Sequence, residues 1–344
     1  MDSMLSPNFR EEDAHEERLR PSFLNEFQGQ NIIKENLRVF ISAADSRGDA
    51  LDHVLLTGPP GLGKTTLAGI IANERGVEFR VTSAPAIEKP KDLAGLLTTI
   101  TPNGVLFIDE IHRLKPVIEE MLYIAMEDYA LDWIIGQGPS ARNVRIPLPP
   151  FTLIGATTKA GKISTPLISR FGITFHFNLY DKDDIVKVIE RSASIMELDI
   201  KDDALFLLAQ CSRGTPRIAN RILRRVRDFA QVYEYDFINS EIVTITMKKL
   251  GIDSYGLEEH DRRILYTILK KFNGGPVGGE NLAIALGESL DTLEDYYEPY
   301  LIRLGFIQRT SRGRIITPRG IEHIKNVYDI AGDDIDNEDQ GFLF

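Results

Sequence analysis

The chain has 344 residues, 43% hydrophobic and 26% charged, which is enough apolar material for two or three domains with their own cores. It contains no run of 18 apolar residues, so we expect no transmembrane helix, and the charged first 20 residues do not fit a secretory signal. The net charge of −11 comes largely from two acidic ends, residues 1–18 and 331–344, which we expect to be mobile arms. The body between them is nearly neutral, so the net charge does not exclude a nucleic-acid partner. The single cysteine, Cys211, excludes an internal disulfide and a cysteine-based metal site, and it fits a reducing cytoplasm.

Apolar runs and helical periodicity predict an α/β domain in the first half of the chain. An arm at residues 19–30 contains a proline and several apolar side chains, so we expect it to be ordered. The predicted helices are 32–46, 92–97 and 119–129, and the predicted strands are 53–56, 77–82, 105–108, 151–156 and 173–177.

A phosphate-binding loop is the strongest motif. The stretch TGPPGLGKTT at residues 57–66 fits G-x-x-x-x-G-K-[ST] and lies between a predicted strand and a predicted helix. Its glycines permit a tight turn in which several N–H groups face one anion, beside the positive end of a helix dipole. Lys64 is expected to reach the β- and γ-phosphates of ATP, and the Thr65 hydroxyl to bind Mg²⁺. The predicted phosphate-binding residues are Gly61, Gly63, Lys64, Thr65 and Thr66.

Two carboxylates follow the apolar strand at 105–108. An acidic pair at a strand end is often only part of a loop, but after a phosphate-binding loop it indicates catalysis, because ligands sit at the carboxyl ends of parallel strands. Asp109 would hold Mg²⁺, mostly through water, and Glu110 would orient or deprotonate the attacking water. The strand at 151–156 ends in Thr157 and Thr158, one of which could position that water or contact the γ-phosphate.

An insertion at about 131–150 has the pattern of a β-hairpin. Two apolar segments, 131–135 and 144–148, flank a glycine-rich turn at 136–140. Apolar residues that the core does not cover would mark a partner surface. The alternative is an extension that packs on its own domain.

Three helices are predicted after Tyr180, at 181–196, 201–211 and 215–234. Thr215 is the expected N-cap of the third, with Pro216 in its first turn, so Arg217 could point back at the nucleotide. The later arginines of this helix fit a solvated face; they are Arg221, Arg224, Arg225 and Arg227.

The last domain, after a linker at 251–258, has the pattern of a winged helix. Helices are predicted at 261–272, 280–286 and 291–304, and strands at 305–310 and 314–317. The segment 303–319 holds five arginines and no acid, so Arg309, Arg312 and Arg314 would be free to contact duplex phosphates. A winged helix used only for protein contacts is the alternative.

Taken in order, these motifs resemble the RuvB family of AAA+ ATPases, bacterial motors that drive branch migration of Holliday junctions. The similar segments cover about residues 19–320 and include RP at 20–21, EFQGQ at 26–30, GPPGLGKTTLA at 58–68, FIDEIHR at 107–113, EDY at 127–129, IGATT at 154–158, RFG at 170–172, RGTPRIAN at 213–220, QRT at 308–310 and RGR at 312–314. The phosphate-binding loop alone would be unspecific, whereas the ordered set is specific.

The resemblance implies a fold and a ring. The fold is an AAA+ P-loop α/β domain with a parallel sheet at 19–180, an all-α lid at 181–252 and a winged-helix head at 255–330. The assembly implied is a homo-hexamer. Members of the family are double-stranded DNA translocases that use ATP and Mg²⁺ in homologous recombination and DNA repair.

The resemblance also implies roles for particular residues. Thr158 would be sensor 1, Arg217 would be sensor 2, and Arg170 would act as an arginine finger on a neighbouring subunit; without the resemblance, a surface or salt-bridged arginine would be the better interpretation of Arg170. The residues implied beside the nucleotide are Leu19, Arg20, Glu127, Asp128, Tyr129 and Tyr180. The hairpin at 131–150 would dock RuvA, RuvC would join the wider complex, and Arg309 and Arg314 would contact DNA.

The sequence departs from the family pattern at two places. Leu290 stands where the family often has a basic residue, so one DNA contact could be missing, and Ile168-Ser169 replaces a more polar pair before Arg170. Two other functions stay open: an AAA+ clamp loader or replication initiator, and a non-catalytic nucleotide-gated scaffold. Intact Asp109, Glu110 and Thr158 argue against the scaffold.

Overall fold

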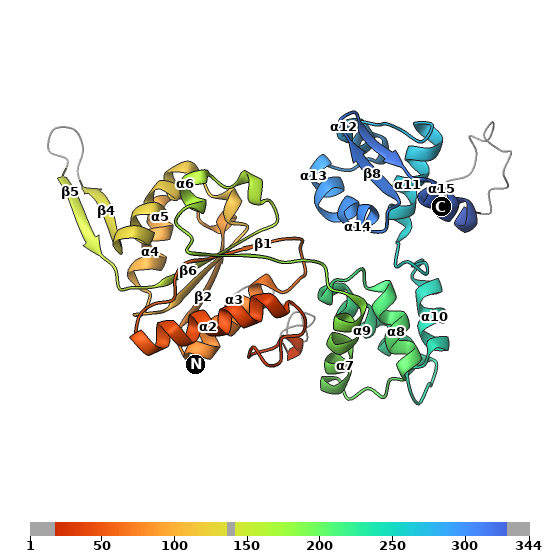
Figure 1. Ribbon diagram of the computed structural model, residues 1–344, viewed down its shortest axis with the longest axis horizontal. Helices are drawn as coiled ribbons and strands as arrows, with labels where there is room; N and C mark the ends of the chain where they lie inside the picture. Colours follow the sequence, from red (N-terminus) through yellow and green to blue (C-terminus); the bar gives the residue numbers. More distant parts are fainter. Residues whose placement is uncertain (1–17, 136–141, 329–344) are drawn as a thin grey trace.

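The computed structural model describes residues 18–135 and 142–328, which form an α/β domain, a helical lid and a mixed head domain in chain order (Figure 1). Residues 1–17 and 329–344, which hold nearly all of the two acidic ends, lie outside the described residues, as does the glycine-rich turn of the hairpin. No helix in the described part of the chain is long and apolar enough to cross a membrane.

A parallel sheet forms the centre of the α/β domain, with the strand order β2-β3-β6-β1-β7. Its strands are β1 (Val54–Thr57), β2 (Phe79–Ser83), β3 (Val105–Asp109), β6 (Thr152–Thr157) and β7 (Ile173–His176). Because all of them run the same way, the loops after β1, β3 and β6 meet at one edge. The register sets Thr57 beside Thr157, so the phosphate-binding loop starts next to the Thr157-Thr158 pair.

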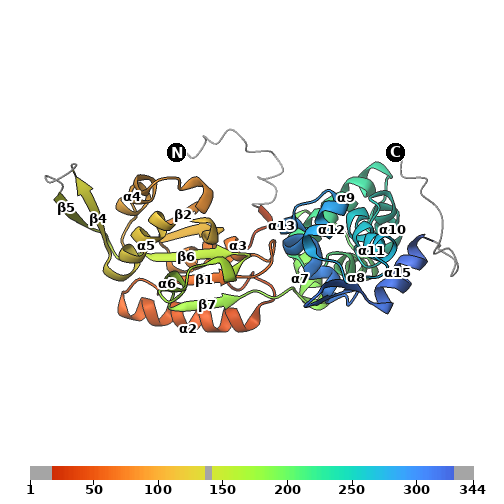
Figure 2. The same cartoon turned by 90° about the horizontal axis from the view of Figure 1, so that it is seen from above.

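Alternate side chains of the central strands enter two cores, one on each face of the sheet. Val105 and Phe107 share a core with α2 and α3, whereas Leu106 and Ile108 share one with α4 and α5. Figure 1 shows α4 and α5 on one side of the sheet and α2 and α3 on the other, and Figure 2 shows the strands one above another from β2 at the top to β7 at the bottom. The helices are α2 (Asn31–Arg47), α3 (Lys64–Arg75), α4 (Pro90–Thr98), α5 (Pro116–Asp128) and α6 (Thr165–Ile168), with short 3-10 turns at Ala84–Ala86, Ile111–Arg113 and Ala160–Lys162. Helices α4 and α5 start earlier than predicted, because Pro90 and Pro116 suit the first helical position.

The predicted hairpin is present as β4 (Ala130–Ile135) and β5 (Arg142–Pro147), which pair antiparallel and project from the end of α5 (Figure 1). At its base Leu131 is fully buried against the domain, whereas Val144 is 40% exposed. The hairpin therefore packs on its own domain at the base and offers apolar surface farther out.

The lid contains a helix that we did not predict. Helices α7 (Lys182–Ile195), α8 (Asp202–Cys211) and α9 (Pro216–Val232) match the prediction, and α10 (Ser240–Lys249) follows them. The β-branched run IVTIT in α10 disfavours a helix locally. The helix forms because Ile242, Val243 and Met247 are buried on the lid core and the Asn239 side chain caps its start.

The head also differs from the prediction in two helices. Its elements are α11 (Glu259–Lys271), α12 (Gly279–Leu286), α13 (Leu290–Thr292), α14 (Glu298–Arg303), β8 (Ile307–Thr310), β9 (Gly313–Ile316) and α15 (Pro318–Tyr328). The single helix predicted at 291–304 is interrupted by a π-turn at Leu293–Tyr297. Helix α15 was missed although Thr317-Pro318 is the same Thr-Pro start signal as Thr215-Pro216.

Candidate active site

A cavity of about 210 Å³ lies between the α/β domain and the lid. It brings together predicted residues from the arm, the phosphate-binding loop, the ends of β3 and β6, and the lid: Leu19, Arg20, Gly61, Gly63, Lys64, Thr65, Thr66, Asp109, Glu110, Thr158, Tyr180 and Arg217. Five segments that are far apart in the sequence thus converge on one site.

The phosphate-binding loop has the backbone that its glycines predict. Gly58, Gly61 and Gly63 all have positive φ, and a Cβ at Gly58 would lie 2.5 Å from the Phe177 carbonyl oxygen. Helix α3 starts at Lys64, so its first N–H groups face the loop. The Lys64 Nζ donates to the carbonyl oxygens of Gly58 and Pro59 at 2.7 and 2.8 Å, and burial lowers its pKa to about 8.

Asp109 and Glu110 lie where β3 ends, at the carboxyl edge of the sheet. Glu110 has φ of 50°, a left-handed conformation that is uncommon for this residue type, and its N–H donates to Asp109 Oδ1 at 3.0 Å. Its Oε2 lies 3.1 Å from His112 Nδ1 and accepts from the Thr158 hydroxyl at 3.5 Å. The two strand ends therefore hold one carboxylate between a ring nitrogen and a hydroxyl.

His112 is a site residue that our sequence analysis missed. Its Nδ1 contacts Thr157 Oγ1 at 2.9 Å as well as Glu110. Burial lowers the pKa of His112, and the neighbouring Glu110 opposes that shift. Its place two residues after Glu110 was the only signal, and the 3-10 turn at Ile111–Arg113 is what returns the ring to the carboxylate.

The lid closes the cavity on its second side. The Tyr180 hydroxyl donates to the Leu62 carbonyl oxygen at 3.2 Å, and burial raises the pKa of Tyr180. The Arg217 N–H reaches the Gly61 carbonyl oxygen at 3.4 Å. Arg191, a second missed residue, lines the cavity and donates to the Leu19 carbonyl oxygen at 2.7 Å. Lid and loop are thus in direct contact around the site.

Arg170 does not line this cavity. It lies before β7, near the amino edge of the sheet, where its guanidinium contacts Glu127 at 3.2 Å and stacks 4.7 Å from the centre of the Tyr123 ring. The Arg170 Nε is buried without a hydrogen-bond partner among the described residues. Within one chain the Arg170 guanidinium is therefore salt-bridged, near the edge of the sheet that is opposite to the phosphate-binding loop.

The resemblance implies that Glu127, Asp128 and Tyr129 lie beside a nucleotide, and the structure places them away from the cavity of their own chain. None of them lines the cavity. Helix α5 starts at the carboxyl edge of the sheet and ends at the amino edge, so it carries them away from the site. There Asp128 pairs with Arg145 at 2.6 Å, and Tyr129 packs against His53 and Phe151.

Two of the wing arginines have acidic partners, contrary to our prediction. Arg309 and Arg314 both pair with Glu298, at 2.7 and 2.8 Å, and both also contact Glu294. These acids precede the segment 303–319 and reach it through the fold. Arg312 differs, because it is exposed at the wing tip and no carboxylate of the described residues pairs with it.

The structure gives a reason for one of the two departures from the family pattern, the one at Leu290. Leu290 packs partly buried against the head core, so its side chain serves the fold at that position. Ile168 is 37% exposed, and the Ser169 hydroxyl donates to the Pro166 carbonyl oxygen. None of the three residues lines the cavity.

Comparisons with known proteins find the same family in three successive parts of the chain. Residues 19–177 match the family model of the Holliday junction DNA helicase RuvB P-loop domain, residues 180–253 that of the RuvB AAA lid domain, and residues 254–325 that of the RuvB C-terminal winged helix domain. The Holliday junction branch migration complex subunit RuvB of Treponema denticola is 63% identical over 93% of this chain and 94% of its own length. The chain belongs to the RuvB family. The RuvB of Borreliella burgdorferi is 58% identical over 91% of this chain and 90% of its own length.

A solved structure agrees with the fold. The Thermotoga maritima RuvB Holliday junction branch migration motor has a TM-score of 0.83 and 49% sequence identity, and covers 90% of this chain and 98% of its own. The predicted RuvB resemblance and the predicted fold class, a P-loop domain with an AAA lid and a winged helix, are thereby confirmed. The chain is a P-loop ATPase of the RuvB family.

Proposed function

We propose that this RuvB-family chain is the motor subunit of a Holliday-junction branch-migration complex. ATP hydrolysis at the site between the α/β domain and the lid moves duplex DNA arms through a four-way junction. The observation that carries the proposal is the convergence of Lys64, Glu110, Thr158 and Arg217 on one cavity between two domains. A change at the γ-phosphate can therefore change how the lid sits on the α/β domain.

The phosphate end of the cavity fits ATP with Mg²⁺. The described residues hold no group of three or more His, Cys, Asp or Glu side chains that could bind a metal alone. Mg²⁺ commonly uses one or two protein groups together with nucleotide phosphates and water, and Thr65 and Asp109 at this cavity provide such groups. When bound, the ion would neutralise charge on the phosphate oxygens.

The residues around the γ-phosphate position divide the chemistry among them. Glu110 orients the attacking water and accepts its proton, while Thr158 and His112 fix the direction of the Glu110 carboxylate. Lys64 exchanges its contacts with the loop carbonyls for contacts with the phosphates. Arg217 brings positive charge from the lid.

A ring completes the site. Arg170 lies near the opposite edge of the sheet from the cavity, and it cannot serve the nucleotide of its own chain. We propose a closed ring of six identical subunits. In this hexamer each Arg170 faces the γ-phosphate of the ATP that is bound to the next subunit. Glu127, Asp128 and Tyr129 lie on the same side and would approach that neighbouring nucleotide too.

The hairpin and the wing are the two parts of the structure that suit contacts with partners. The projecting hairpin, with Val144 exposed, suits an apolar contact with RuvA, which holds the junction. Arg312 at the wing tip suits a phosphate contact with duplex DNA. RuvC would join the wider complex, and work on chromosomal DNA would place the assembly in the bacterial cytoplasm. The relatives' function favours this motor over the clamp-loader or initiator alternative.

The test is ATP-dependent dissociation of a synthetic four-way junction by the purified chain with RuvA. The proposal predicts that junctions separate only when ATP, RuvA and the chain are all present. A Lys64→Ala variant should fail, while still binding RuvA. ATP hydrolysis without any movement of junctions would contradict the motor and support the loader alternative.

A further inference from the structure

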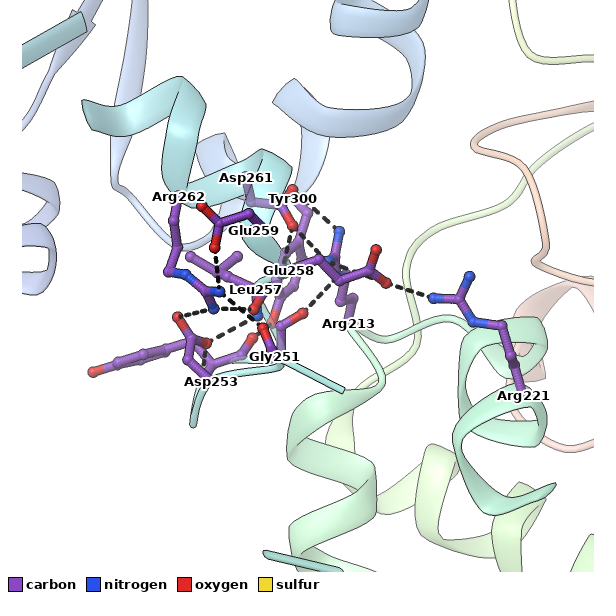
Figure 3. Close-up of polar contacts among 12 residues, drawn as sticks. Arg213, Arg221, Gly251, Asp253, Leu257, Glu258, Glu259, Asp261, Arg262 and Tyr300 are labelled. Atoms are coloured by element: carbon purple, nitrogen blue, oxygen red, sulfur yellow. Dashed lines mark hydrogen bonds and ion pairs between the residues drawn. The ribbon is translucent and has the colours of Figure 1, made fainter. Parts of the chain in front are cut away.

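A buried ion pair connects the lid to the head. Arg213, just before α9, donates from Nη2 to Asp261 Oδ2 at 2.5 Å and from Nη1 to Oδ1 at 3.2 Å, and its Nε donates to the Gly256 carbonyl oxygen at 2.8 Å (Figure 3). Asp261 is fully buried and Arg213 is 4% exposed. The two-point geometry and the third hydrogen bond use most of the guanidinium donors, so the contact is specific in orientation.

The head side of this pair is fixed by its own helix. Asp261 Oδ2 also accepts from the Glu258 N–H at 2.8 Å, which caps the start of α11. The Arg213 guanidinium lies 5.5 Å from the centre of the Tyr300 ring, and the Tyr300 hydroxyl donates to the Tyr255 carbonyl oxygen. Arg213 therefore enters a preformed pocket of the head.

The lid side of the pair leads directly to the nucleotide cavity. Arg213 and Gly214 both have positive φ, and a Cβ at Gly214 would lie 2.6 Å from the Tyr180 carbonyl oxygen. The Gly214 carbonyl oxygen accepts from the Tyr180 N–H at 2.9 Å, and three residues later the backbone N–H of Arg217 donates to the Gly61 carbonyl oxygen at 3.4 Å. A short, tightly held segment thus joins the head to Arg217, which lines the cavity.

The segment that we predicted as a linker is also held. Arg262 donates to the carbonyl oxygens of Gly251 and Leu257 at 2.9 and 2.8 Å, and His323 contacts Asp253 at 2.9 Å. These contacts leave little freedom for a hinge between lid and head. The head also contacts the α/β domain, where Lys159 pairs with Asp291 and Asp295 at 2.7 and 2.8 Å, but these carboxylates are 69% and 34% exposed whereas Asp261 is fully buried. We therefore expect the exposed pairs, rather than the buried one, to separate when the lid moves on the α/β domain.

We propose that Arg213 is a positioning residue that makes the lid and the head one rigid body and sets Arg217 according to the position of the head. The proposal rests on the proposed function, because it takes the head as the DNA-binding part and Arg217 as a nucleotide contact. Separating a buried ion pair leaves a charge without a partner, which is strongly unfavourable, so the pair holds while the lid moves. DNA bound at the head then acts on the nucleotide through Arg213.

The first experiment replaces the pair without burying a lone charge. In an Arg213→Met/Asp261→Leu double variant, apolar side chains replace both charged groups, and such replacements commonly keep a protein folded. The matched control is Arg221→Ala, which removes the lid–head ion pair between Arg221 and Glu258, whose side chains are 45% and 37% exposed. Thermal melting establishes that each full-length variant is folded.

The readout is the stimulation of ATP hydrolysis by duplex DNA. We expect the double variant to bind DNA as the wild type does. The factor by which DNA stimulates its ATP hydrolysis should be at least tenfold lower, and the decrease should appear in kcat. The control should keep it. Full stimulation in the folded double variant would overturn the proposal. If DNA failed to stimulate the wild type at all, the proposed function would fail first.

A second measurement needs neither DNA nor a change at the ion pair. Cys211 is buried, so fluorescent labels can be attached selectively to exposed sites on the lid (Gln231→Cys), the head (Glu280→Cys) and the α/β domain (Arg38→Cys). Labelled subunits are diluted into unlabelled ones and compared in ADP and in a non-hydrolysable ATP analogue. The proposal predicts a constant lid–head distance and a changing distance from the α/β domain to the lid. A lid–head distance that changes with the nucleotide would overturn it.

Discussion

The Thr158 hydroxyl lies 3.5 Å from Glu110 Oε2, although the two residues are 48 positions apart in the chain. The parallel register of β3 and β6 produces this contact. A Thr158→Val variant keeps the shape of the side chain and removes its only donor. We expect kcat for ATP hydrolysis to fall about 10²-fold, the loss usual for one positioned donor, with ATP affinity nearly unchanged. Steady-state kinetics and nucleotide titration measure both, and an unchanged kcat would exclude Thr158 from catalysis.

ATP binding should take up a proton at Lys64. Burial lowers the pKa of Lys64 to about 8, and the negative phosphates will raise it again in the complex. ATP affinity should therefore fall as the pH rises above about 8. Calorimetry at pH 8.5 in two buffers of different ionisation enthalpy measures the uptake. A Lys64→Arg variant, whose guanidinium stays charged, should show none; equal uptake in the variant would assign the proton to another group.

Acid should destabilise the fold through His53. Its Nδ1 accepts from the Leu153 N–H at 2.9 Å and its Nε2 contacts the Met126 carbonyl oxygen at 3.1 Å, so the ring must be neutral. Burial lowers the pKa of His53, which means that the unfolded chain binds a proton that the folded chain does not. The stability that depends on neutral His53 is complete above pH 6.5 and is lost as the pH falls, by up to about 1.4 kcal/mol per unit.

Denaturant unfolding between pH 7.5 and 5.5 checks the role of His53. A His53→Gln variant keeps one donor and one acceptor in a side chain that does not titrate. Its stability should depend less steeply on pH than that of the wild type. Parallel curves for the two proteins would assign the acid sensitivity to other groups.

The wing arginines should separate into two classes. Arg312→Ala should weaken duplex binding and lower the slope of log affinity against log salt by about 1, without changing the melting temperature. Arg314→Ala should instead destabilise the head by about 3 kcal/mol, because Glu298 is 1% exposed and would keep only Arg309. Salt titrations and melting curves of both variants test this. A stable Arg314→Ala variant with a lower salt slope would reverse the assignment.

The sequence was sufficient for those parts of the site that depend on local rules. The glycines around Lys64 need positive φ, and Asp109 and Glu110 follow a strand buried on both faces, so motif and periodicity together predict the carboxyl edge of the sheet. Thr215-Pro216 likewise predicts the helix start that brings Arg217 to the cavity. Each of these predictions uses neighbours within a few residues.

The parts that failed depend on contacts between distant segments. The IVTIT run of α10 favours a strand until the lid core covers it, and Glu298 neutralises Arg309 and Arg314 only because a π-turn and a helix set it under the wing. A sequence pattern also does not show that α5 carries Glu127 away from the cavity of its own chain. His112 escaped notice for a similar reason, since its role depends on a 3-10 turn beside a second strand.

The central claim is that Arg170 of one subunit completes the ATP site of another, and a mixing experiment tests it most directly. Lys64→Ala subunits keep the finger and lose the phosphate contact, whereas Arg170→Ala subunits keep the site and lose the finger. Each alone should be nearly inactive, because an arginine finger contributes about 10³–10⁵ in rate in other nucleotide hydrolases. Mixed in one ring, the two should recover part of the ATP hydrolysis and junction movement. A mixture as inactive as its parents, or full activity in Arg170→Ala alone, would contradict the account.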